Sequence, residues 1–388
     1  MSWEYIRLGD VCAKIGSGAT PKGGSTVYID EGMSFIRSQN IYNLEFSHEG
    51  LAHITEDAAK KLNGVAVQKD DVLINITGDS VARTCMVPDA VLPARVNQHV
   101  AIVRPDSNRL NPRFLNYYLA SPYMQSLMLG LAVGKGASRN AMTKDMLANF
   151  DILCPPIEIQ ESIVGILSTY DALIENNQKQ IKLLEEAAQR LYKEWFVDLR
   201  FPGYENTPIV DGVPEGWADG TLGDIAVFKR GKTITKAQVS DGNIPVVAGG
   251  LEPAYYHNKA NTTAPLITVS ASGANAGFTR LYNIDVFASD CSYIDSNSTP
   301  FLLFVYCFLK TNAMKLNSLQ KGSAQPHVYA KDLNALVLSV PSEGVLTAFC
   351  GIVSPYFERI RLLQRENEIA AQARDRLLPK LMSGEIEV

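Results

Sequence analysis

The sequence lacks the features that define membrane, secreted and metal-binding proteins. No apolar run approaches the ~18 residues that a membrane-spanning helix needs, and the first residues do not form a signal-peptide pattern. The 6 cysteines include no C-x-x-C pair, and the 5 histidines show no spacing typical of metal ligands. We therefore expect a soluble cytoplasmic protein that keeps its cysteines reduced and holds no metal.

The chain also lacks an excess of positive charge. Its 36 Lys and Arg residues are outnumbered by 41 Asp and Glu residues, which gives a net charge of −5. A protein that coats DNA electrostatically by itself needs a basic surface, so this balance argues against that class. Most of the acidic excess lies in residues 155–200, so local patches elsewhere remain free to contact a nucleic acid.

Signatures of catalysis are weak as well. Residues 226–233 fit a permissive phosphate-binding loop, but Ala226 replaces the first glycine and the following residues predict turn and strand where a helix is required. Methyltransferase signatures are absent, and the sequence at 111–113 predicts only a helix start. A nuclease carboxylate cluster or a Ser/His/Asp set stays open. We predict a protein that is not an enzyme and binds no cofactor itself.

What the sequence does contain is a long heptad pattern. From Ile163 to Trp195, positions spaced alternately four and three residues apart are apolar except for Asn177. A pattern sustained over this length predicts a long helix that pairs with another helix in a coiled coil. The same register recurs 186 residues later, from Phe349 to Leu381, so the partner helix is in the same chain.

An antiparallel pairing of these helices sets a specific register. If a pseudo-two-fold axis passes through the centre of the pattern, Asn177 lies opposite Asn367. Two amides that meet in an apolar seam would fix the register and orientation of the helices. The same alignment places Tyr170 opposite Arg374, within reach of a cation–π contact.

The rest of the chain is doubled too. Trp3 and the Leu-Gly-Asp sequence at 8–10 recur 214 residues later, at Trp217 and 222–224. Each opening leads into short Val- and Ile-rich runs bounded by Gly, Asn and Pro, which predict β-strands, and then into a helical stretch. We predict an α+β fold with an internal pseudo-two-fold repeat, in which two globular mixed α/β domains are separated by two long antiparallel helices. The predicted segments are 1–154, 155–200, 201–340 and 341–388.

Two groups of residues are candidates for contacting a polyanion. A loop with Lys beside Gly occurs at the same place in both repeats, where glycine permits close backbone approach to phosphate and lysine adds charge. Polar and basic side chains near the ends of predicted strands are candidate readers of base edges. Ordinary exposed turns and surface polar residues are the alternative interpretations. The candidates are Arg37, Ser38, Gln39, Asn40, Thr77, Asp79, Arg83, Arg95, Asn97, Lys135, Gly136, Arg139, Ser272, Asn275, Arg280, Lys321, Gly322 and Gln325.

The long helices and the segments after them carry a family resemblance. Residues 160–203, 214–217 and 376–386 are similar to the conserved regions of type I restriction-modification DNA specificity subunits. The last of these stretches reads Arg-Leu-Leu-Pro-Lys-Leu-Met-Ser-Gly-Glu-Ile. The two globular domains fall where that family has its target-recognition domains, so the resemblance spans the whole chain.

This resemblance implies a function and partners. Each globular domain would read one half of a bipartite, double-stranded DNA site through the major groove, and the helix pair would set their separation. Two modification subunits that carry S-adenosylmethionine and methylate adenine would dock on the chain. Restriction subunits that use ATP and Mg for translocation would join them. The alternative from another class is a coiled-coil adaptor whose globular domains bind protein and make no DNA contact.

Overall fold

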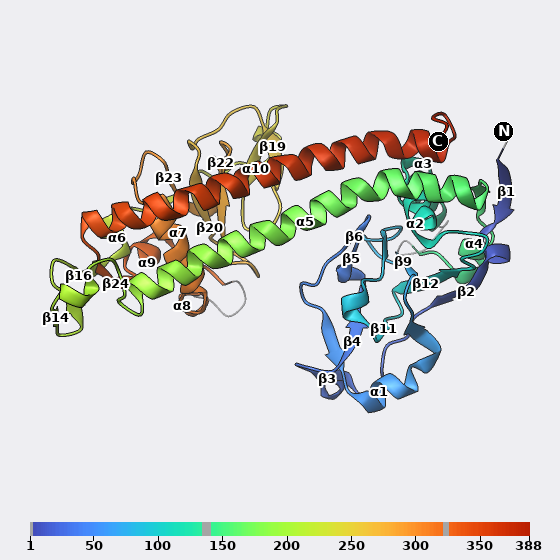
Figure 1. Ribbon diagram of the computed structural model, residues 1–388, viewed down its shortest axis with the longest axis horizontal. Coiled ribbons are helices and arrows are strands. Elements are labelled where there is room, and N and C mark those ends of the chain that lie inside the picture. The colour runs from blue at the N-terminus through green and yellow to red at the C-terminus, as the bar shows by residue number, and fades with distance from the viewer. Residues whose placement is uncertain (1–2, 134–140, 321–325) are drawn as a thin grey trace. The chain divides into compact units, whose positions relative to one another are not determined.

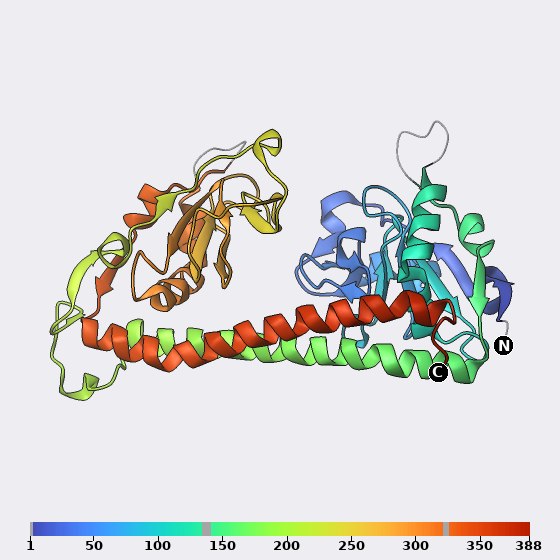
Figure 2. The same cartoon turned by 90° about the horizontal axis from the view of Figure 1, so that it is seen from above.

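The chain forms two compact units in a computed structural model that describes residues 3–133, 141–320 and 326–388 (Figures 1 and 2). Unit 1 comprises Met1–Ile174 and Glu368–Val388, and unit 2 comprises Glu175–Asn367. Each unit therefore holds one mixed α/β lobe, which we call lobe 1 (residues 3–154) and lobe 2 (residues 201–340), together with part of both long helices. This division differs from the four predicted segments, because each long helix is shared between the units.

Lobe 1 is built on two sheets. The first has the antiparallel strand order β10-β9-β12-β2, and the second has the order β3-β7-β4-β11-β8, with β4 and β11 parallel. Strand β9 is buried at every position, as its apolar sequence predicts for the middle of a covered sheet. The strands are β1 Glu4–Arg7, β2 Cys12–Ser17, β3 Tyr28–Ile29, β4 Met33–Ile36, β5 Ile41–Tyr42, β6 Glu45–Phe46, β7 Ala52–Ile54, β8 Ala66–Val67, β9 Val72–Asn75, β10 Thr84–Met86, β11 Ala94–Val96, β12 Val100–Pro105 and β13 Asp151–Cys154. The helices are α1 Glu56–Lys61, α2 Pro112–Ala120, α3 Pro122–Ala132 and α4 Lys144–Ala148.

Lobe 2 repeats the strand connections of lobe 1 with fewer residues. Its sheets have the orders β17-β23-β20-β21 and β19-β18-β22, and β18 and β22 are parallel. Its strands are β14 Ile209–Val210, β15 Val213–Pro214, β16 Ala218–Thr221, β17 Lys229–Arg230, β18 Ile244–Val247, β19 Tyr255–His257, β20 Leu266–Ser270, β21 Thr279–Tyr282, β22 Phe287–Ala288, β23 Cys291–Asp295 and β24 Val337–Val340. Its helices are α6 Leu222–Ile225, α7 Leu302–Thr311, α8 Ala313–Ser318 and α9 Ala330–Asn334.

The internal repeat is confirmed by the pairing of the strands. In lobe 1 the first strand pairs with the last, β1 with β13, and in lobe 2 β16 pairs with β24 in the same antiparallel sense. Each last strand leads into a helix of 40 residues, α5 (Ile157–Phe196) after lobe 1 and α10 (Glu343–Met382) after lobe 2. The predicted α+β chain with two long helices is therefore the observed one.

A buried glutamine fastens the start of α5 to lobe 1. The Gln160 side chain is fully buried, and its Nε2 donates to the carbonyl oxygens of Pro155 (2.8 Å) and Arg109 (3.1 Å). Its Oε1 accepts from the backbone N–H of Asn111 at 2.8 Å. The amide satisfies backbone groups of lobe 1 and of the segment that leads into α5, which explains its place just before the long heptad pattern.

Aromatic packing joins α5 and α10 to lobe 2 within unit 2. The rings of Trp195 and Phe349 lie 5.9 Å apart, and Phe196 contacts Phe349 at 5.0 Å. Trp217, at the start of lobe 2, lies against Phe196 (5.9 Å) and Phe201 (4.9 Å). The aromatic residues that carry the family resemblance thus form one core, because each buries a large apolar surface against the others.

The pairing of α5 with α10 agrees with the predicted antiparallel register to within one residue. In unit 2 the Asn177 amide donates to Glu366 at 2.9 Å, next to the predicted partner Asn367. The buried Oδ1 of Asn367 has no hydrogen-bond partner among the described residues. The predicted contact between the two amides is therefore wrong, because the amide of Asn177 bonds the carboxylate of Glu366 in place of Asn367.

In unit 1 a charged network takes the place of the predicted cation–π contact. Nη1 of Arg374 donates to Oδ1 of Asp171 at 2.7 Å, and the Tyr117 hydroxyl donates to the other carboxylate oxygen. Asp171 follows Tyr170, the predicted partner of Arg374, so the register holds although the chemistry differs. Burial and the negative charge of Asp171 raise the pKa of Tyr117, so the phenol stays protonated and acts as a donor.

We expect Arg374→Met to destabilise this part of unit 1 by about 1–3 kcal/mol, because it leaves the half-buried Asp171 carboxylate without its cation. The free energy of local opening in residues 368–382, measured by hydrogen exchange, checks this. Arg376→Met removes an exposed cation two residues away and should change that free energy by less than about 0.5 kcal/mol. Equal effects of the two changes would contradict the network.

Candidate nucleic-acid interface

Both lobes build the same turn after a central strand. Strands β9 and β20 each lead into a glycine, Gly78 or Gly273, with φ of +79° in both cases. The N–H of Val81 donates to the Gly78 carbonyl at 3.2 Å, and the N–H of Ala276 donates to the Gly273 carbonyl at 3.0 Å. Glycine is needed here because other residues rarely adopt this left-handed conformation. The candidate Asp79 is exposed in the first of these turns.

A second turn contacts the same strand end in both lobes. The N–H of Ile76 donates to the carbonyl oxygen of His99 at 2.9 Å, and the N–H of Ala271 donates to that of Asp290 at 3.2 Å. His99 and Asp290 therefore occupy corresponding positions, just before β12 and β23. The backbone is shared, and the side chains differ in charge and hydrogen-bonding capacity.

Hydroxyl side chains connect the two turns. In lobe 1, Oγ1 of Thr77 lies 2.5 Å from Nδ1 of His99. In lobe 2, the hydroxyl of Ser272 donates to the carboxylate of Asp290. Two predicted candidates, Thr77 and Ser272, thus sit at equivalent places, each bonded to a residue that sequence analysis did not single out.

A third segment approaches this site so closely that only glycine fits. The N–H of Gly18 donates to the carbonyl of Val100, and the N–H of Gly231 donates to that of Cys291, both at 2.8 Å. A Cβ atom built on Gly18 would lie 2.2 Å from a backbone carbonyl oxygen, and one built on Gly231 would lie 2.3 Å from its counterpart. Both distances are far inside van der Waals contact, so the backbone approach itself selects glycine.

The residues before these glycines differ between the lobes. Ser17 precedes Gly18 in lobe 1, and Arg230 precedes Gly231 in lobe 2. The guanidinium of Arg230 donates to the carboxylate of Asp290. Lobe 2 therefore carries an ion pair where lobe 1 carries a hydroxyl and an imidazole.

The loop after the parallel strand completes the site. In lobe 1, Nδ2 of Asn75 donates to the carbonyl oxygen of Ser38 at 2.8 Å. In lobe 2, the Ser270 hydroxyl donates to the carbonyl of Gly249 at 3.2 Å, and the candidate Asn275 donates to the same oxygen at 3.4 Å. The predicted cluster at 37–40 is thereby brought next to the Thr77 turn. We call the site in each lobe, made of these four segments, the strand-end site.

Asn40 stabilises this loop, and its predicted role as a base reader is wrong because the side chain is buried. It is fully buried, and its Oδ1 accepts from the N–H of Arg37 at 3.0 Å while its Nδ2 donates to the Ser47 carbonyl at 3.0 Å. The side chains of Arg37 and Gln39 both donate to the carbonyl oxygen of Gly50, at 2.7 and 3.2 Å. They remain candidates at the surface.

The prediction that Arg95 and Asn97 read base edges is also wrong, because both side chains lie in the interior. Arg95 is 9% exposed and donates to the carbonyl of Ala59 at 3.1 Å and to Oδ1 of Asn63 at 2.7 Å. Burial lowers its pKa. Asn97 is 8% exposed, and its Oδ1 accepts from the N–H of His99 at 3.1 Å. Both side chains shape the lobe and are not free to meet a base.

The two remaining arginine candidates among the described residues stack on tyrosines. Arg83 lies over the ring of Tyr42 at 4.7 Å, and Arg280 lies over Tyr282 at 5.0 Å. Nη1 of Arg280 also donates to the carbonyl of Leu251 at 2.9 Å. Stacking fixes each guanidinium plane, which reduces the entropy lost when its outer edge binds an acceptor.

The predicted basic loops lie outside the described residues and stay predictions. The described residues that follow them contact the strand-end sites, because Ala141 pairs with Thr77 and His327 pairs with Ser272 in isolated β-bridges. The candidates concerned are Lys135, Gly136, Arg139, Lys321, Gly322 and Gln325.

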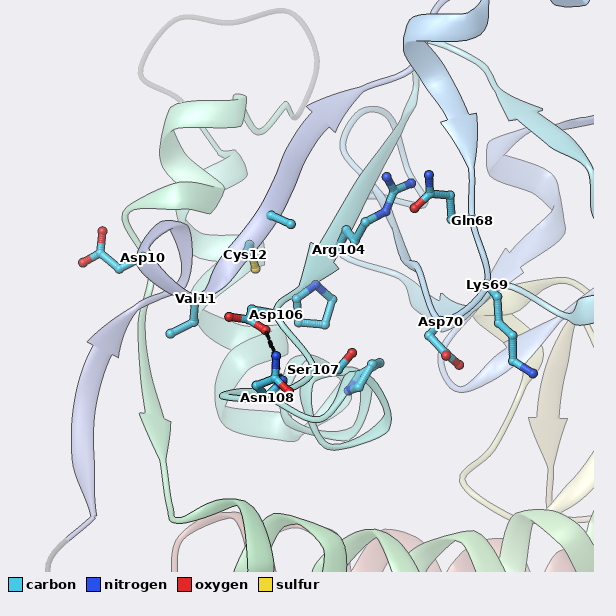
Figure 3. Close-up of a pocket in the computed structure, with 13 residues that line it drawn as sticks. Asp10, Val11, Cys12, Gln68, Lys69, Asp70, Arg104, Asp106, Ser107 and Asn108 are labelled. Atoms are coloured by element: carbon cyan, nitrogen blue, oxygen red, sulfur yellow. Dashed lines mark hydrogen bonds between the residues drawn. The ribbon is translucent and has the colours of Figure 1, made fainter.

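A cavity of about 560 Å³ in unit 1 lies at the opposite ends of β2 and β12 and does not suit a polyanion (Figure 3). The carboxylates of Asp10, Asp70 and Asp106 line it together with two cations. One of these, Arg104, is neutralised by the buried Asp71 through two bonds of 2.7 and 2.8 Å. This cavity therefore reflects lobe packing, and the strand-end sites are the better candidates.

Catalytic and metal-binding alternatives find no support in the described residues. No group of three or more His, Cys, Asp or Glu side chains there could hold a metal ion. Burial raises the pKa of Cys291 to about 12, which keeps this thiol beside the lobe 2 site in its protonated, weakly nucleophilic form. The phosphate-loop candidate at 226–233 contains strand β17 and no helix follows it directly, so that interpretation is excluded. Over the same described ranges, the helices are too short or too polar to cross a membrane.

Several residues of the strand-end sites, Ser17 among them, were not predicted from the sequence. Gly18 and Gly231 follow the two repeated openings at nearly equal spacing, so an alignment of the repeats carries a signal for them. Arg230, His99 and Asp290 carry no such signal, because the corresponding positions hold unlike residues. Only the shared backbone hydrogen bonds reveal that they correspond.

Comparison with known proteins identifies the class of this chain. The family described as type I restriction modification DNA specificity domain matches residues 1–186 and again residues 214–369. The two matches cover most of the chain, the first contains lobe 1 and the second contains lobe 2 from residue 214 onward, so the chain belongs to this family.

Individual relatives extend over the full length. The chain is 25% identical over 417 residues to the type I restriction enzyme MjaIX specificity subunit of Methanocaldococcus jannaschii, covering 100% of this chain and 94% of the relative. It is 22% identical to the HindI specificity subunit of Haemophilus influenzae, covering 99% of both chains. Its fold is similar to the crystal structure of a type I restriction-modification system S subunit from M. genitalium, with a TM-score of 0.55, 16% identity and coverage of 98% of this chain and 96% of that chain.

We expect Gly231→Ala to destabilise unit 2 by roughly 1–3 kcal/mol, because the new methyl group would overlap a fixed carbonyl oxygen. Gly351→Ala is the matched control, since it lies on an exposed face of α10 with nothing within 4 Å. Helix propensity predicts that this control stabilises by about 1 kcal/mol. Urea unfolding of both variants measures the difference, and a Gly231→Ala protein as stable as the wild type would refute the close approach.

Proposed function

We propose that this chain is the sequence-specific DNA-recognition subunit of a type I restriction-modification complex, and that each lobe reads one half of a bipartite site. The observation that carries the proposal is the strand-end site, which is built twice on the same backbone with different side chains. Family membership supports the same function. The corresponding side chains are Ser17, Thr77 and His99 in lobe 1 and Arg230, Ser272 and Asp290 in lobe 2.

The chemistry of these groups suits base edges in a major groove. Guanine presents two acceptors there, adenine an acceptor and a donor, and cytosine a donor, so discrimination needs fixed donors and acceptors of both kinds. The two sites offer hydroxyl, imidazole, carboxylate and guanidinium groups, and all of these except the Ser17 hydroxyl are held by at least one hydrogen bond within the described residues. Because the lobes differ in these groups, the two half-sites they read would differ in sequence.

The proposal assigns the catalytic work to partner subunits. A chain with net charge −5 gains little from phosphate attraction alone, so partners would supply much of the nonspecific affinity. Two modification subunits would carry S-adenosylmethionine, and restriction subunits would use ATP and Mg. This chain would be non-catalytic and would act in the cytoplasm.

Exposed apolar side chains on the long helices support docking of such partners. In unit 2, Leu183 of α5 is 63% exposed, and Leu362 of α10 is exposed as well. In unit 1, Leu173 and Ile369 are exposed on the same two helices. Exposed apolar residues that recur along both helices fit a surface that another protein covers.

The alternative function is an adaptor whose lobes bind protein without DNA contact. It shares the helix surface with the proposed function, so that surface does not discriminate between the two. An adaptor predicts no salt-dependent DNA affinity even when partner subunits are present, whereas a DNA reader predicts a steep salt dependence.

Exchanging lobe 1 for the equivalent lobe of a relative should change one half of the methylated sequence and leave the other half intact. The expectation follows because each strand-end site is complete within its own lobe. Mapping methylated adenines in cells that carry this chain and its modification partner provides the measurement. Methylation sites that do not change after the exchange would refute the assignment.

Substituting Lys135, in a predicted basic loop, tests the phosphate contact. In the assembled complex, Lys135→Ala should weaken binding to all sequences and lower the slope of log affinity against log salt by about 1. Lys179→Ala on α5 is the control, since Lys179 pairs with Glu175 at 2.6 Å and should leave the slope unchanged. Equal slopes for Lys135→Ala and the wild type would argue against a phosphate contact at this loop.

A further inference from the structure

An arginine in lobe 2 is held in place by a chain of hydrogen bonds. The guanidinium of Arg230 donates through Nη2 to one carboxylate oxygen of Asp290, and the Ser272 hydroxyl donates to the other oxygen. Ser272 lies two residues after the end of β20, where His327 pairs with it in a β-bridge. The carboxylate is thus fixed on both oxygens, and it fixes the guanidinium in turn.

The remaining donors of this arginine are available to a ligand. Neither Nε nor Nη1 of Arg230 has a hydrogen-bond partner within the described residues. The Arg230 side chain is 44% exposed, while Asp290 behind it is 31% exposed. Arg230 ends β17, the edge strand of its sheet, so no further strand of that sheet covers it. The second N–H of Nη2 forms a parallel donor pair with Nε or with Nη1, on the side that Asp290 leaves open, and such a planar pair on a rigid support matches two adjacent acceptors.

We infer that Arg230 reads a guanine in the half-site of lobe 2, donating to O6 and N7 in the major groove, and that Asp290 and Ser272 are its positioning residues. This inference rests on the proposed function. Guanine is the base that presents two acceptors side by side in the major groove, which is the pattern a guanidinium edge matches.

The charge of the site favours a base over a phosphate. Asp290 cancels the charge of Arg230 at hydrogen-bonding distance, so a phosphate that approaches the arginine also meets a carboxylate. A guanine edge has no net charge, so the carboxylate repels it much less than it repels a phosphate. A cation meant for phosphate is better left unpaired, as the neighbouring Lys229 is, since that exposed side chain forms no ion pair within the described part of lobe 2.

Lobe 1 does not share this reader. Ser17 occupies the position of Arg230, and His99 occupies that of Asp290, so neither the guanidinium nor its carboxylate support is present. The inferred guanine contact therefore belongs to one half of the bipartite site only.

The test uses the complex of this chain with its modification subunits. The methylated site is first mapped, and its lobe 2 half is identified by lobe exchange. Arg230→Ala should then lose the preference for guanine at one position of that half, by roughly 5- to 150-fold in relative affinity, and leave other positions unchanged. A duplex with 7-deazaguanine at that position, which lacks N7, should weaken the wild type and leave Arg230→Ala unaffected.

Matched variants separate reading from charge and from folding. Arg230→Lys keeps the charge but not the planar donor pair, so it should retain overall affinity and lose most of the preference. Lys229→Ala removes a neighbouring cation on the opposite face of the strand and should leave the preference intact. Asp290→Asn and Ser272→Ala should reduce the preference at the same position only, with the thermal midpoint of each complex measured as the folding control.

Three results would overturn the inference. One is a lobe 2 half-site without a G·C pair. Another is a uniform loss of affinity in Arg230→Ala with a lower salt slope, which would make Arg230 a phosphate contact. The third is an unchanged preference for guanine in both Arg230 variants. This third result contradicts the inference about Arg230 but does not contradict the proposed function. Failure of the wild-type complex to methylate any specific sequence would instead refute the proposed function itself.

Discussion

At the ends of the central strands of both lobes, main chain lies so close to main chain that the sequence there is fixed by backbone geometry. Gly18 and Gly231 lie where any side chain would strike a carbonyl oxygen, and Gly78 and Gly273 adopt a backbone conformation that other residues avoid. The hydrogen bonds that join these segments run between backbone groups. Side chains on the same segments can therefore change without loss of the fold. A protein that changes its binding specificity without changing its fold needs the fold to depend on backbone contacts and the specificity to depend on side chains.

The long helices combine apolar packing with a few polar contacts that differ from one unit to the other. In unit 1 Arg374 pairs with Asp171, and in unit 2 Asn177 bonds Glu366. Polar groups inside a helix pair add little stability, because desolvation offsets most of their attraction, but they penalise shifted registers that would leave them unpaired. Stability comes instead from aromatic packing such as that of Trp195 against Phe349. In each long helix, apolar and aromatic residues provide the stability, and a few polar residues set the register.

The sequence predicts periodic features well and contacts between distant side chains poorly. The heptad spacing gave both long helices and their register to within one residue, because packing energy depends on the periodicity itself. It could not show that Glu366 would reach Asn177 before Asn367 does. Thr77 and Ser272 were found because they follow apolar runs, whereas Arg95 and Asn97 were misjudged because polarity alone does not reveal burial. Arg230 and Asp290 are 60 residues apart, so no local pattern could join them.

The sharing of α10 between the units has a consequence for the order in which the chain acquires its structure during synthesis. The core of unit 1 includes Leu378, Leu381 and Met382, which leave the ribosome after all of unit 2. Unit 2 is a single stretch of chain, so its core can close first, although it starts later. Until the end of α10 has been synthesised, the apolar face of lobe 1 that it covers stays exposed. A nascent chain therefore passes through a stage in which unit 2 can be folded while the core of unit 1 is still incomplete. A chaperone that covers apolar surface would act at this stage.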